Sequence, residues 1–287
     1  MVVAAPGLTA FVLGGGGVLG AAEVGMLRAL FEAGIGPDLL LGTSVGALNG
    51  ALVAAHGPGP EVIDRLQQLW ESAAGGKEVY GDGPVRQVSR VVRTGTHLHD
   101  SSALRRRLHE ELGDRTFADL LVPFQCCAAS IERAAEHWFT TGRVVDAVMA
   151  SAAVPGLLEP AEVDGAHYLD GGIVNSIPVG RAAECGADRV FVLQVGRVER
   201  PLRPPRRPWE VARVSFEIAR RHRFHYDMAH LPEGTTAHVL PTGGGSAKDD
   251  SLLAYRSFAK VRDRIDAAYD ASRAYLEERG LANGSAS

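Results

Sequence analysis

The stretch Thr9-Ala10-Phe11-Val12-Leu13-Gly14-Gly15-Gly16-Gly17-Val18-Leu19-Gly20 decides the fold of this chain. Its first five residues predict a buried strand. The glycines that follow leave the backbone N–H groups of the loop uncovered by side chains. A helix is predicted to begin at about Gly20 or Ala21, and the positive end of its dipole points the same way. The loop is therefore expected to attract an anion or a developing negative charge.

A second predicted strand ends in a serine motif. The apolar run Leu39-Leu40-Leu41 is typical of a buried parallel strand, and Gly42-Thr43-Ser44-Val45-Gly46 follows it directly. Where a strand reverses straight into a helix, the residues two before and two after the turn come close together, so Gly42 and Gly46 must lack side chains. The hydroxyl of Ser44 is then expected on a strained turn that opens into a crevice, near the first N–H groups of the helix.

Two interpretations of the glycine loop need to be separated. Gly15, Gly17 and Gly20 fit a dinucleotide-binding fingerprint, and Asp38 lies about the expected distance downstream. Asp38 precedes the second strand, however, whereas a ribose-binding acid belongs at its end. We favour the interpretation that pairs the loop with the serine. Adjacent parallel strands end side by side, so the N–H groups of Gly15, Gly16 and Gly17 are predicted to face Ser44 as an oxyanion hole.

The composition is that of an ordinary soluble protein. Hydrophobic residues make up 46% of the chain and charged residues 22%, and the net charge of -4 gives no reason to expect a nucleic-acid partner. A chain of 287 residues can form one large domain, which we expect over residues 1–280, with a frayed tail at 281–287. Residues 1–22 carry no side-chain charge, but they lack the basic start and the cleavage site of a signal peptide. No segment has the length and apolarity of a membrane span.

The three cysteines show no metal-binding or redox spacing, which favours a reducing, cytoplasmic setting. Cys126 and Cys127 are interpreted as buried, unreactive thiols. His97 and His99 alternate in a predicted loop, but without a third ligand nearby we interpret them as solvated. We therefore predict no metal site.

Residues 61–115 are predicted to form a helical excursion from the sheet. Apolar residues recur at helical spacing after Pro60, and further helices are expected at 85–93 and 102–112. Such a segment beside an active site is either a lid over the substrate or a plain packing layer, and both interpretations stay open.

The rest of the chain alternates strands and helices, which predicts an α/β fold. We expect a three-layer α/β/α sandwich with a mostly parallel central sheet, including strands at 121–129, 136–140, 189–195 and 237–240 and helices at 144–153, 178–186, 209–230 and 250–279. A hairpin over 161–169 leads to Asp170-Gly171-Gly172. An aspartate before two glycines is either a turn former or a carboxylate kept uncovered for chemistry.

A basic segment lies between Arg197 and Arg223, where nine arginines stand against three acidic residues. Prolines keep its first half irregular, and its second half is the start of the helix predicted over 209–230, with apolar residues set among the basic ones. Two interpretations stay open: a face that docks on anionic lipid headgroups, and a solvated arginine-rich surface.

A serine nucleophile needs a base. The usual chain order of serine, acid and histidine would place the histidine after Asp170, at His222, His225, His230 or His238. None of these lies in a recognisable loop at the end of a strand. A serine-aspartate-histidine esterase nevertheless stays an alternative.

Three blocks of this sequence together resemble the patatin-like phospholipases: the glycine loop at 15–20, the elbow at 42–46 and Asp170-Gly171-Gly172. The run at 150–156, followed by Pro160 and Asp164-Gly165, is also similar to that family's approach to its aspartate. The similarity covers about Ala10 to Leu193, roughly two thirds of the chain, and the combination and order of the blocks are specific.

The resemblance implies a lipid acyl hydrolase that works through a serine-aspartate dyad, without a metal or an organic cofactor. Ser44 is implied as the nucleophile and Asp170 as the general base. The N–H of Val45 is implied to join Gly15, Gly16 and Gly17 in the oxyanion hole, and the elbow and dyad are supported by four glycines, Gly42, Gly46, Gly171 and Gly172.

The implied substrates are lipid esters, such as phospholipids and lysophospholipids. The family often has a basic residue just before the last glycine of the loop, where this chain has Leu19. A cation that would help to bind a phosphate headgroup is therefore missing from the loop, so ester hydrolysis is better supported than phospholipid as the substrate. The alternative from another class is a non-catalytic, membrane-associated scaffold on the same fold, with the basic segment as its working part.

Overall fold

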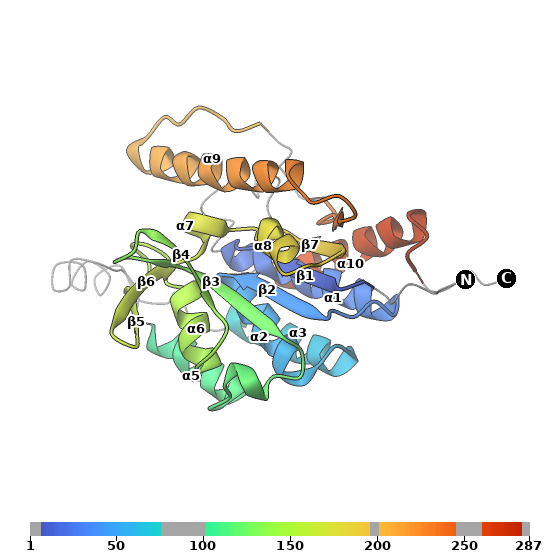
Figure 1. The fold of residues 1–287 in the computed structure, drawn as a ribbon, viewed down its shortest axis with the longest axis horizontal. Coiled ribbons are helices and arrows are strands. Elements are labelled where there is room, and N and C mark those ends of the chain that lie inside the picture. The colour runs from blue at the N-terminus through green and yellow to red at the C-terminus, as the bar shows by residue number, and fades with distance from the viewer. Residues whose placement is uncertain (1–6, 76–100, 196–200, 245–259, 283–287) are drawn as a thin grey trace.

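The computed structural model describes residues 7–75, 101–195, 201–244 and 260–282 (Figure 1). The helix predicted at 85–93, the two loop histidines His97 and His99, and the first part of the helix predicted at 250–279 lie outside the described residues. So do Arg197, at the start of the basic segment, and most of the predicted tail.

Eight described strands form one mixed sheet in the order β5-β6-β3-β2-β1-β7-β8, and β4 pairs with β3. The strands are β1 (Thr9–Leu13), β2 (Leu39–Thr43), β3 (Phe124–Ser130), β4 (Ala135–Phe139), β5 (Ala161–Val163), β6 (Ala166–Asp170), β7 (Arg189–Leu193) and β8 (Thr236–Val239). Strands β1, β2, β3, β7 and β8 run parallel, and antiparallel pairing is confined to β4, β5 and β6.

Helices cover both faces of the sheet, as expected for a three-layer α/β/α sandwich (Figure 1). The described helices are α1 (Ala21–Glu32), α2 (Val45–His56), α3 (Pro60–Gly75), α5 (Ser102–Leu112), α6 (Val144–Ser151), α7 (Gly172–Asn175), α8 (Val179–Glu184), α9 (Pro208–Ala229) and α10 (Val261–Glu278), with 3-10 turns η1 (Gly17–Gly20) and η2 (Phe117–Asp119).

Strand β1 shows how the two layers of core arise from the sequence. All five of its residues are buried, because neighbouring strands flank both edges and helices cover both faces. Phe11 and Leu13 belong to the core cluster shared with α1, α2, α3, α5, α6 and α10, whereas Ala10 and Val12 belong to the cluster shared with α8 and α9. This alternation follows from the period of two along a strand.

Strand β3 begins three residues later than predicted. The expected strand started at Leu121, but β3 starts at Phe124, directly after Pro123. Proline has no N–H to donate to a sheet ladder. The N–H groups of Leu121 and Val122 instead donate to the carbonyl of Ala54 near the end of α2, at 2.8 and 3.2 Å.

The register along β3 brings distant parts of the chain together. Thr43, the last residue of β2, is paired with Cys127. Strand β6 then takes the place of β2 beside β3, and its last residue, Asp170, is paired with Ala128. The residue after β2 and the last residue of β6 therefore meet at the carboxyl end of the sheet.

Candidate active site

Ser44 occupies a strained turn between β2 and α2. Its φ of 55° and ψ of -122° lie in a region that residues with a side chain rarely adopt. The Ser44 N–H donates to the Ser151 hydroxyl at 2.9 Å, and that hydroxyl donates to the carbonyl of Cys127 at 2.5 Å. These two bonds fix the turn to the neighbouring strand β3.

The glycines of the elbow are required by close backbone approaches, as predicted. A Cβ on Gly42 would lie 2.6 Å from the Cα of Ala47. A Cβ on Gly46 would lie 2.2 Å from the carbonyl oxygen of Leu13. The backbone that excludes a side chain at Gly46 is therefore that of β1 and not that of Gly42. Both approaches exclude any side chain.

The hydroxyl of Ser44 donates to Oδ2 of Asp170 at 2.6 Å. The other oxygen of this carboxylate, Oδ1, accepts from the N–H of Gly172 at 2.7 Å. Both side chains are buried, with Ser44 7% and Asp170 4% exposed. A Cβ on Gly171 would lie 2.2 Å from the carbonyl oxygen of Cys127, so a larger residue would push the carboxylate away from β3.

Burial raises the pKa of the Asp170 carboxyl to about 6, although the hydrogen bonds from Ser44 and from the Gly172 N–H lower it. An aspartate at its ordinary pKa would be too weak a base for a serine hydroxyl. This carboxyl is therefore a stronger base than usual and still ionised above neutral pH.

The glycine loop faces the serine, but one of its predicted donors is occupied. A Cβ on Gly15 would lie 3.3 Å from the Cβ of Ser44, so the loop and this serine are neighbours. The N–H of Gly15, however, donates to the carbonyl of Ser176 at 2.9 Å, which corrects the prediction that it faces the oxyanion. Among the described residues, the N–H groups of Gly16, Gly17 and Val45 have no acceptor.

A cavity of about 140 Å³ opens beside Ser44. Its lining is mostly apolar and comes from α2, α3, α5 and the segment after α6, and includes Leu48, Leu52, Leu69, Trp70, Leu104 and Leu158. The described helices of the 61–115 excursion therefore line this cavity. They also supply core residues such as Leu66 and Leu112, so the covering role and the packing role occur together.

A second buried acid supports the loop and was not foreseen from the sequence. Glu23, on the first turn of α1, accepts from the Asn49 amide at 2.7 Å. The same amide donates to the carbonyl of Gly20 at 3.1 Å, and the Trp70 indole donates to Oδ1 of Asn49 at 3.2 Å. Burial raises the pKa of Glu23 well above its ordinary value. No motif marks these residues, because their spacing suits an ordinary helix.

Among the described residues, no histidine hydrogen-bonds to Ser44 or Asp170. His222 and His225 are exposed on α9, and the His230 ring contacts the carbonyl of Tyr226 on its own helix. His238 stacks on Phe191 within the sheet.

No cluster of His, Cys, Asp or Glu suited to a metal occurs in the described part of the chain. Cys126 and Cys127 are buried free thiols, and burial raises the pKa of both. A raised thiol pKa means little thiolate at neutral pH, in keeping with unreactive cysteines.

Similarity to known proteins was found at several levels. "Lysophospholipase nte1" of Aspergillus terreus is 32% identical over 195 residues, as is that of Emericella nidulans; the match spans 66% of this chain but only 12% of either relative. Among solved structures, the match to VipD of Legionella pneumophila covers 96% of this chain and 67% of the VipD chain, with a TM-score of 0.45 and 14% identity. Such a distant likeness adds nothing to the assignment.

The family model "Patatin-like phospholipase" matches residues 11–183. The matched region contains the glycine loop, the elbow with Ser44, and Asp170, and it spans more than half of the chain. The chain therefore belongs to the patatin-like phospholipase family.

Proposed function

We propose that this chain hydrolyses carboxylic ester bonds of lipids through a dyad of Ser44 and Asp170, within a single domain over residues 1–280. The observation that carries the proposal is the 2.6 Å hydrogen bond from the buried serine hydroxyl to a carboxylate whose pKa burial raises. Membership of the patatin-like phospholipase family supports the same class of reaction.

In the first half of the reaction, Asp170 takes the proton of Ser44 as Oγ attacks the ester carbonyl carbon. The tetrahedral oxyanion accepts hydrogen bonds from the free N–H groups of Gly16, Gly17 and Val45. When the intermediate collapses, Asp170 gives its proton to the departing alcohol oxygen, and the acyl group stays on Ser44. Losing one such donor typically costs about 3 kcal/mol of transition-state stabilisation, so these backbone groups carry much of the rate.

In the second half, Asp170 takes a proton from a water molecule, which attacks the acyl carbonyl. The second tetrahedral intermediate releases the carboxylic acid and returns the proton to Ser44. No metal or organic cofactor is required for these steps.

The apolar cavity beside Ser44 suits the acyl chain of the substrate. Leucines and Trp70 make up much of its lining and offer dispersion contacts, while Arg107 and Glu111 add charged groups to it. The lysophospholipase names of the similar fungal proteins fit a substrate with one long chain. A panel of esters of graded chain length, beside phospholipid and lysophospholipid, will show which substrate is preferred.

Labelling by a fluorophosphonate tests the catalytic proposal directly. We expect covalent labelling of Ser44, with no labelling and no hydrolysis in Ser44→Ala. A non-catalytic scaffold on the same fold would give no labelling in the native protein. Changing any one of the histidines is expected to leave most of the activity, whereas loss of activity at a single histidine would support a serine-aspartate-histidine esterase.

The proposed partner beyond the substrate is an anionic membrane, contacted at its cytoplasmic face through the segment from Arg197 to Arg223. None of the described helices is long and apolar enough to cross a bilayer. The outer side of α9 exposes Val211, Ile218 and Tyr226, each about half exposed. Val214 and Phe224, two further apolar residues of this helix, are buried and so are not available to a membrane.

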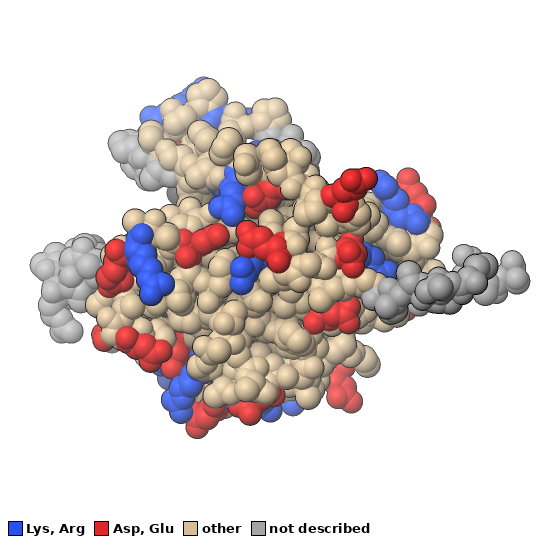
Figure 2. All heavy atoms as spheres, viewed as in Figure 1, with Lys and Arg blue, Asp and Glu red and all other residues tan. Residues whose placement is uncertain are grey.

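The surface around α9 combines apolar and basic groups. Figure 2 shows mostly uncharged side chains over α9, with basic side chains above it, whereas acidic and basic side chains mix over the body. Phe216 lies beside the catalytic carboxylate: a Cβ on Gly172 would be 3.1 Å from the Phe216 ring. An apolar rim next to the active site, with basic residues before it, favours contact with anionic lipid.

Sedimentation with vesicles of phosphatidylcholine and phosphatidylglycerol tests this contact. Ile218→Ser is expected to weaken binding about tenfold, because the loss of one inserted side chain is worth about 1.5 kcal/mol. The control is Leu121→Ser, which removes a side chain that is 69% exposed just before β3, where the backbone contacts the end of α2 and not α9. Equal binding by both variants would contradict the proposed surface.

A further inference from the structure

The short helix α7 and the residue after it touch all three parts of the site. The N–H of Gly172 holds Oδ1 of Asp170 at 2.7 Å. The carbonyl of Asn175 accepts from the hydroxyl of Thr43, the residue before the nucleophile, at 2.8 Å. The carbonyl of Ser176 accepts from the N–H of Gly15 in the glycine loop at 2.9 Å. The position of this segment therefore sets the carboxylate, the elbow and the loop relative to one another.

Helix α9 holds this segment through Arg220. The side chain of Arg220 is 3% exposed, and its Nε donates to the hydroxyl of Ser176 at 3.0 Å. The guanidinium also lies 3.4 Å from Glu217, one turn earlier on α9. The Ser176 hydroxyl is itself close to the site, since a Cβ on Gly15 would lie 3.2 Å from it.

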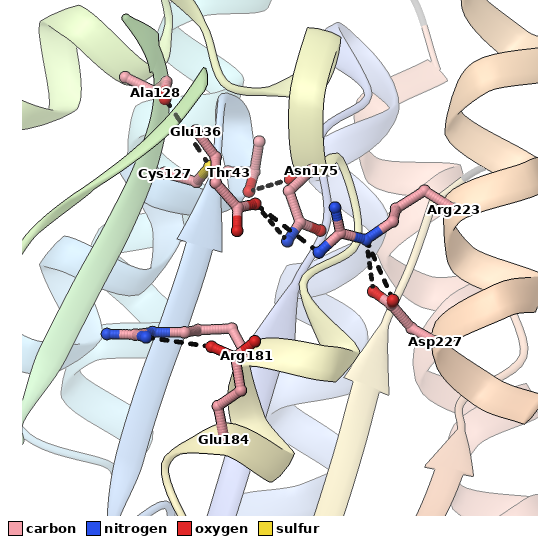
Figure 3. Close-up of polar contacts among 9 residues, drawn as sticks. All are labelled: Thr43, Cys127, Ala128, Glu136, Asn175, Arg181, Glu184, Arg223 and Asp227. Carbon is pink, nitrogen blue, oxygen red and sulfur yellow. Dashed lines mark hydrogen bonds and ion pairs between the residues drawn. The ribbon is translucent and has the colours of Figure 1, made fainter. Parts of the chain in front are cut away.

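A second arginine of α9 reaches the same segment through the sheet (Figure 3). Arg223 lies 3.8 Å from Glu136 of β4, and Glu136 accepts from the Asn175 amide at 3.1 Å. Asp227, which is buried, anchors Arg223 at 3.0 Å. Two links, one direct and one through β4, thus connect α9 to the residues that end α7.

The burial of Arg220 is not explained by stability. Taking a guanidinium out of water costs free energy, and an ion pair at 3.4 Å offsets it only in part. One of its nitrogens, Nη2, is buried without a hydrogen-bond partner among the described residues. Buried charged groups of this kind are costly to keep, and an apolar side chain would fill the space more cheaply.

We propose that Arg220 is a positioning residue, which acts through Ser176 to hold α7 in the place where Ser44, Asp170 and the glycine loop are aligned. The inference rests on the proposed function and deepens it. It assigns a role in catalysis to a residue that lies outside the three sequence blocks of the family and comes from the basic segment.

The test uses Ser176→Ala, Arg220→Gln and the double variant on a water-soluble p-nitrophenyl ester, so that membrane contact plays no part. Ser176→Ala removes only the hydroxyl that Arg220 holds and keeps the carbonyl that holds Gly15. Each single variant is expected to lower kcat about 10- to 100-fold, the effect of a small misplacement of reacting groups, with KM within about twofold. The kcat of the double variant should be no lower than that of the less active single variant, because both changes remove the same contact.

A matched control is Arg181→Gln. Arg181 lies on α8, where it pairs with Glu184 (Figure 3), and it also donates to Gln125 at 3.0 Å. Its contacts in the described part of the chain are with Gln125, Glu184 and Trp138 rather than with α7, and kcat is expected to stay at the native value. The pH profile adds a second readout, since a loosened Gly172 hydrogen bond raises the pKa of Asp170 and moves the acid limb of kcat upward. The control should leave that limb in place.

The results separate this inference from the function on which it rests. Native protein that neither hydrolyses esters nor reacts with a fluorophosphonate would refute the proposed function. Active native protein with kcat unchanged in Ser176→Ala and in folded Arg220→Gln would overturn the positioning role alone. Variants that lose only melting temperature, with kcat and the acid limb unchanged, would also overturn it.

Discussion

Two buried carboxylic acids lie close to the glycine loop, and they differ in what they can do. Asp170 is 4% exposed at the end of β6, and Glu23 is fully buried on the first turn of α1. Burial raises the pKa of both. Asp170 accepts from a hydroxyl whose proton it can take, whereas Glu23 accepts from the Asn49 amide, which gives up no proton.

The comparison shows that two buried acids can differ in their hydrogen-bond partners and so in the chemistry open to them. The pKa of Asp170 rises only to about 6, because the Ser44 hydroxyl and the Gly172 N–H stabilise its charged form. Burial also raises the pKa of Glu23 well above its ordinary value, and this acid serves as a hydrogen-bonding group under the loop. The hydrogen bonds that Asp170 accepts therefore limit the rise of its pKa. One of its two donors, the Ser44 hydroxyl, carries a proton that the carboxylate can take.

The largest difference is expected from amide substitutions at the two sites. Asp170→Asn removes the group that accepts the serine proton, and turnover of a p-nitrophenyl ester at pH 8 should fall about a thousandfold. Glu23→Gln keeps the shape of the side chain and an oxygen that accepts from the Asn49 amide, and turnover should stay within about twofold of native. Substantial turnover in Asp170→Asn would exclude this aspartate as the base.

The next largest effect is expected from Asn49→Ala. This change leaves the Glu23 carboxyl, the Gly20 carbonyl and the Trp70 indole without their partner. The free energy of unfolding should drop by about 3 kcal/mol, since each buried unsatisfied group costs about 1 to 3 kcal/mol. Urea denaturation measures this drop. A change below about 0.5 kcal/mol would show that water replaces the amide.

The pH dependence of kcat sharpens the comparison further. Because the general base must be ionised, kcat should fall about tenfold per pH unit below the pKa of Asp170, about 6, and level off above it. The acid limb should be the same in Glu23→Gln, since Glu23 takes no part in the proton transfer. An acid limb that disappears in Glu23→Gln would show that the limb reports the titration of Glu23 and not of Asp170.

The smallest effect concerns stability at the Glu23 site. Its folded pKa lies above the ordinary 4.5, so the stability that it contributes is present below pH 4.5 and lost as the pH rises through the folded pKa. Gln has no proton to lose. Glu23→Gln should therefore gain in unfolding free energy relative to native as the pH is raised from 5 to 8, measured by urea denaturation. An equal difference at both pH values would contradict a raised pKa of Glu23.

Local geometry made part of the site predictable from the sequence. The bounds of β1 and the position of Ser44 after β2 follow from apolar runs and from glycines that a tight turn requires. The role of Asp170 came from the family resemblance, because an aspartate before two glycines is ambiguous by itself. Its meeting with Ser44 depends on the register of β6 on β3, which no local pattern specifies.

The rest of the site depends on tertiary contacts and could not be predicted. Ser151 stood out only as part of a run of small residues, and its hydroxyl turns out to fix the elbow. Helix α7 is too short to leave a periodic signal. Gly15 looked like an oxyanion donor, but the carbonyl of Ser176 takes its N–H. Nothing in the sequence distinguishes Arg220 from a surface arginine, because the arginines of this helix do not indicate which of its faces is buried.

The succession of β2 and β6 along one side of β3 has a consequence for how this chemistry can be carried between proteins. Ser44 follows one strand that pairs with β3, and Asp170 ends another strand that pairs with β3, so a single central strand sets the places of both residues. An arrangement anchored on one strand is suited to polypeptides of very different size. This fits a chain whose counterpart makes up 12% of much longer fungal relatives.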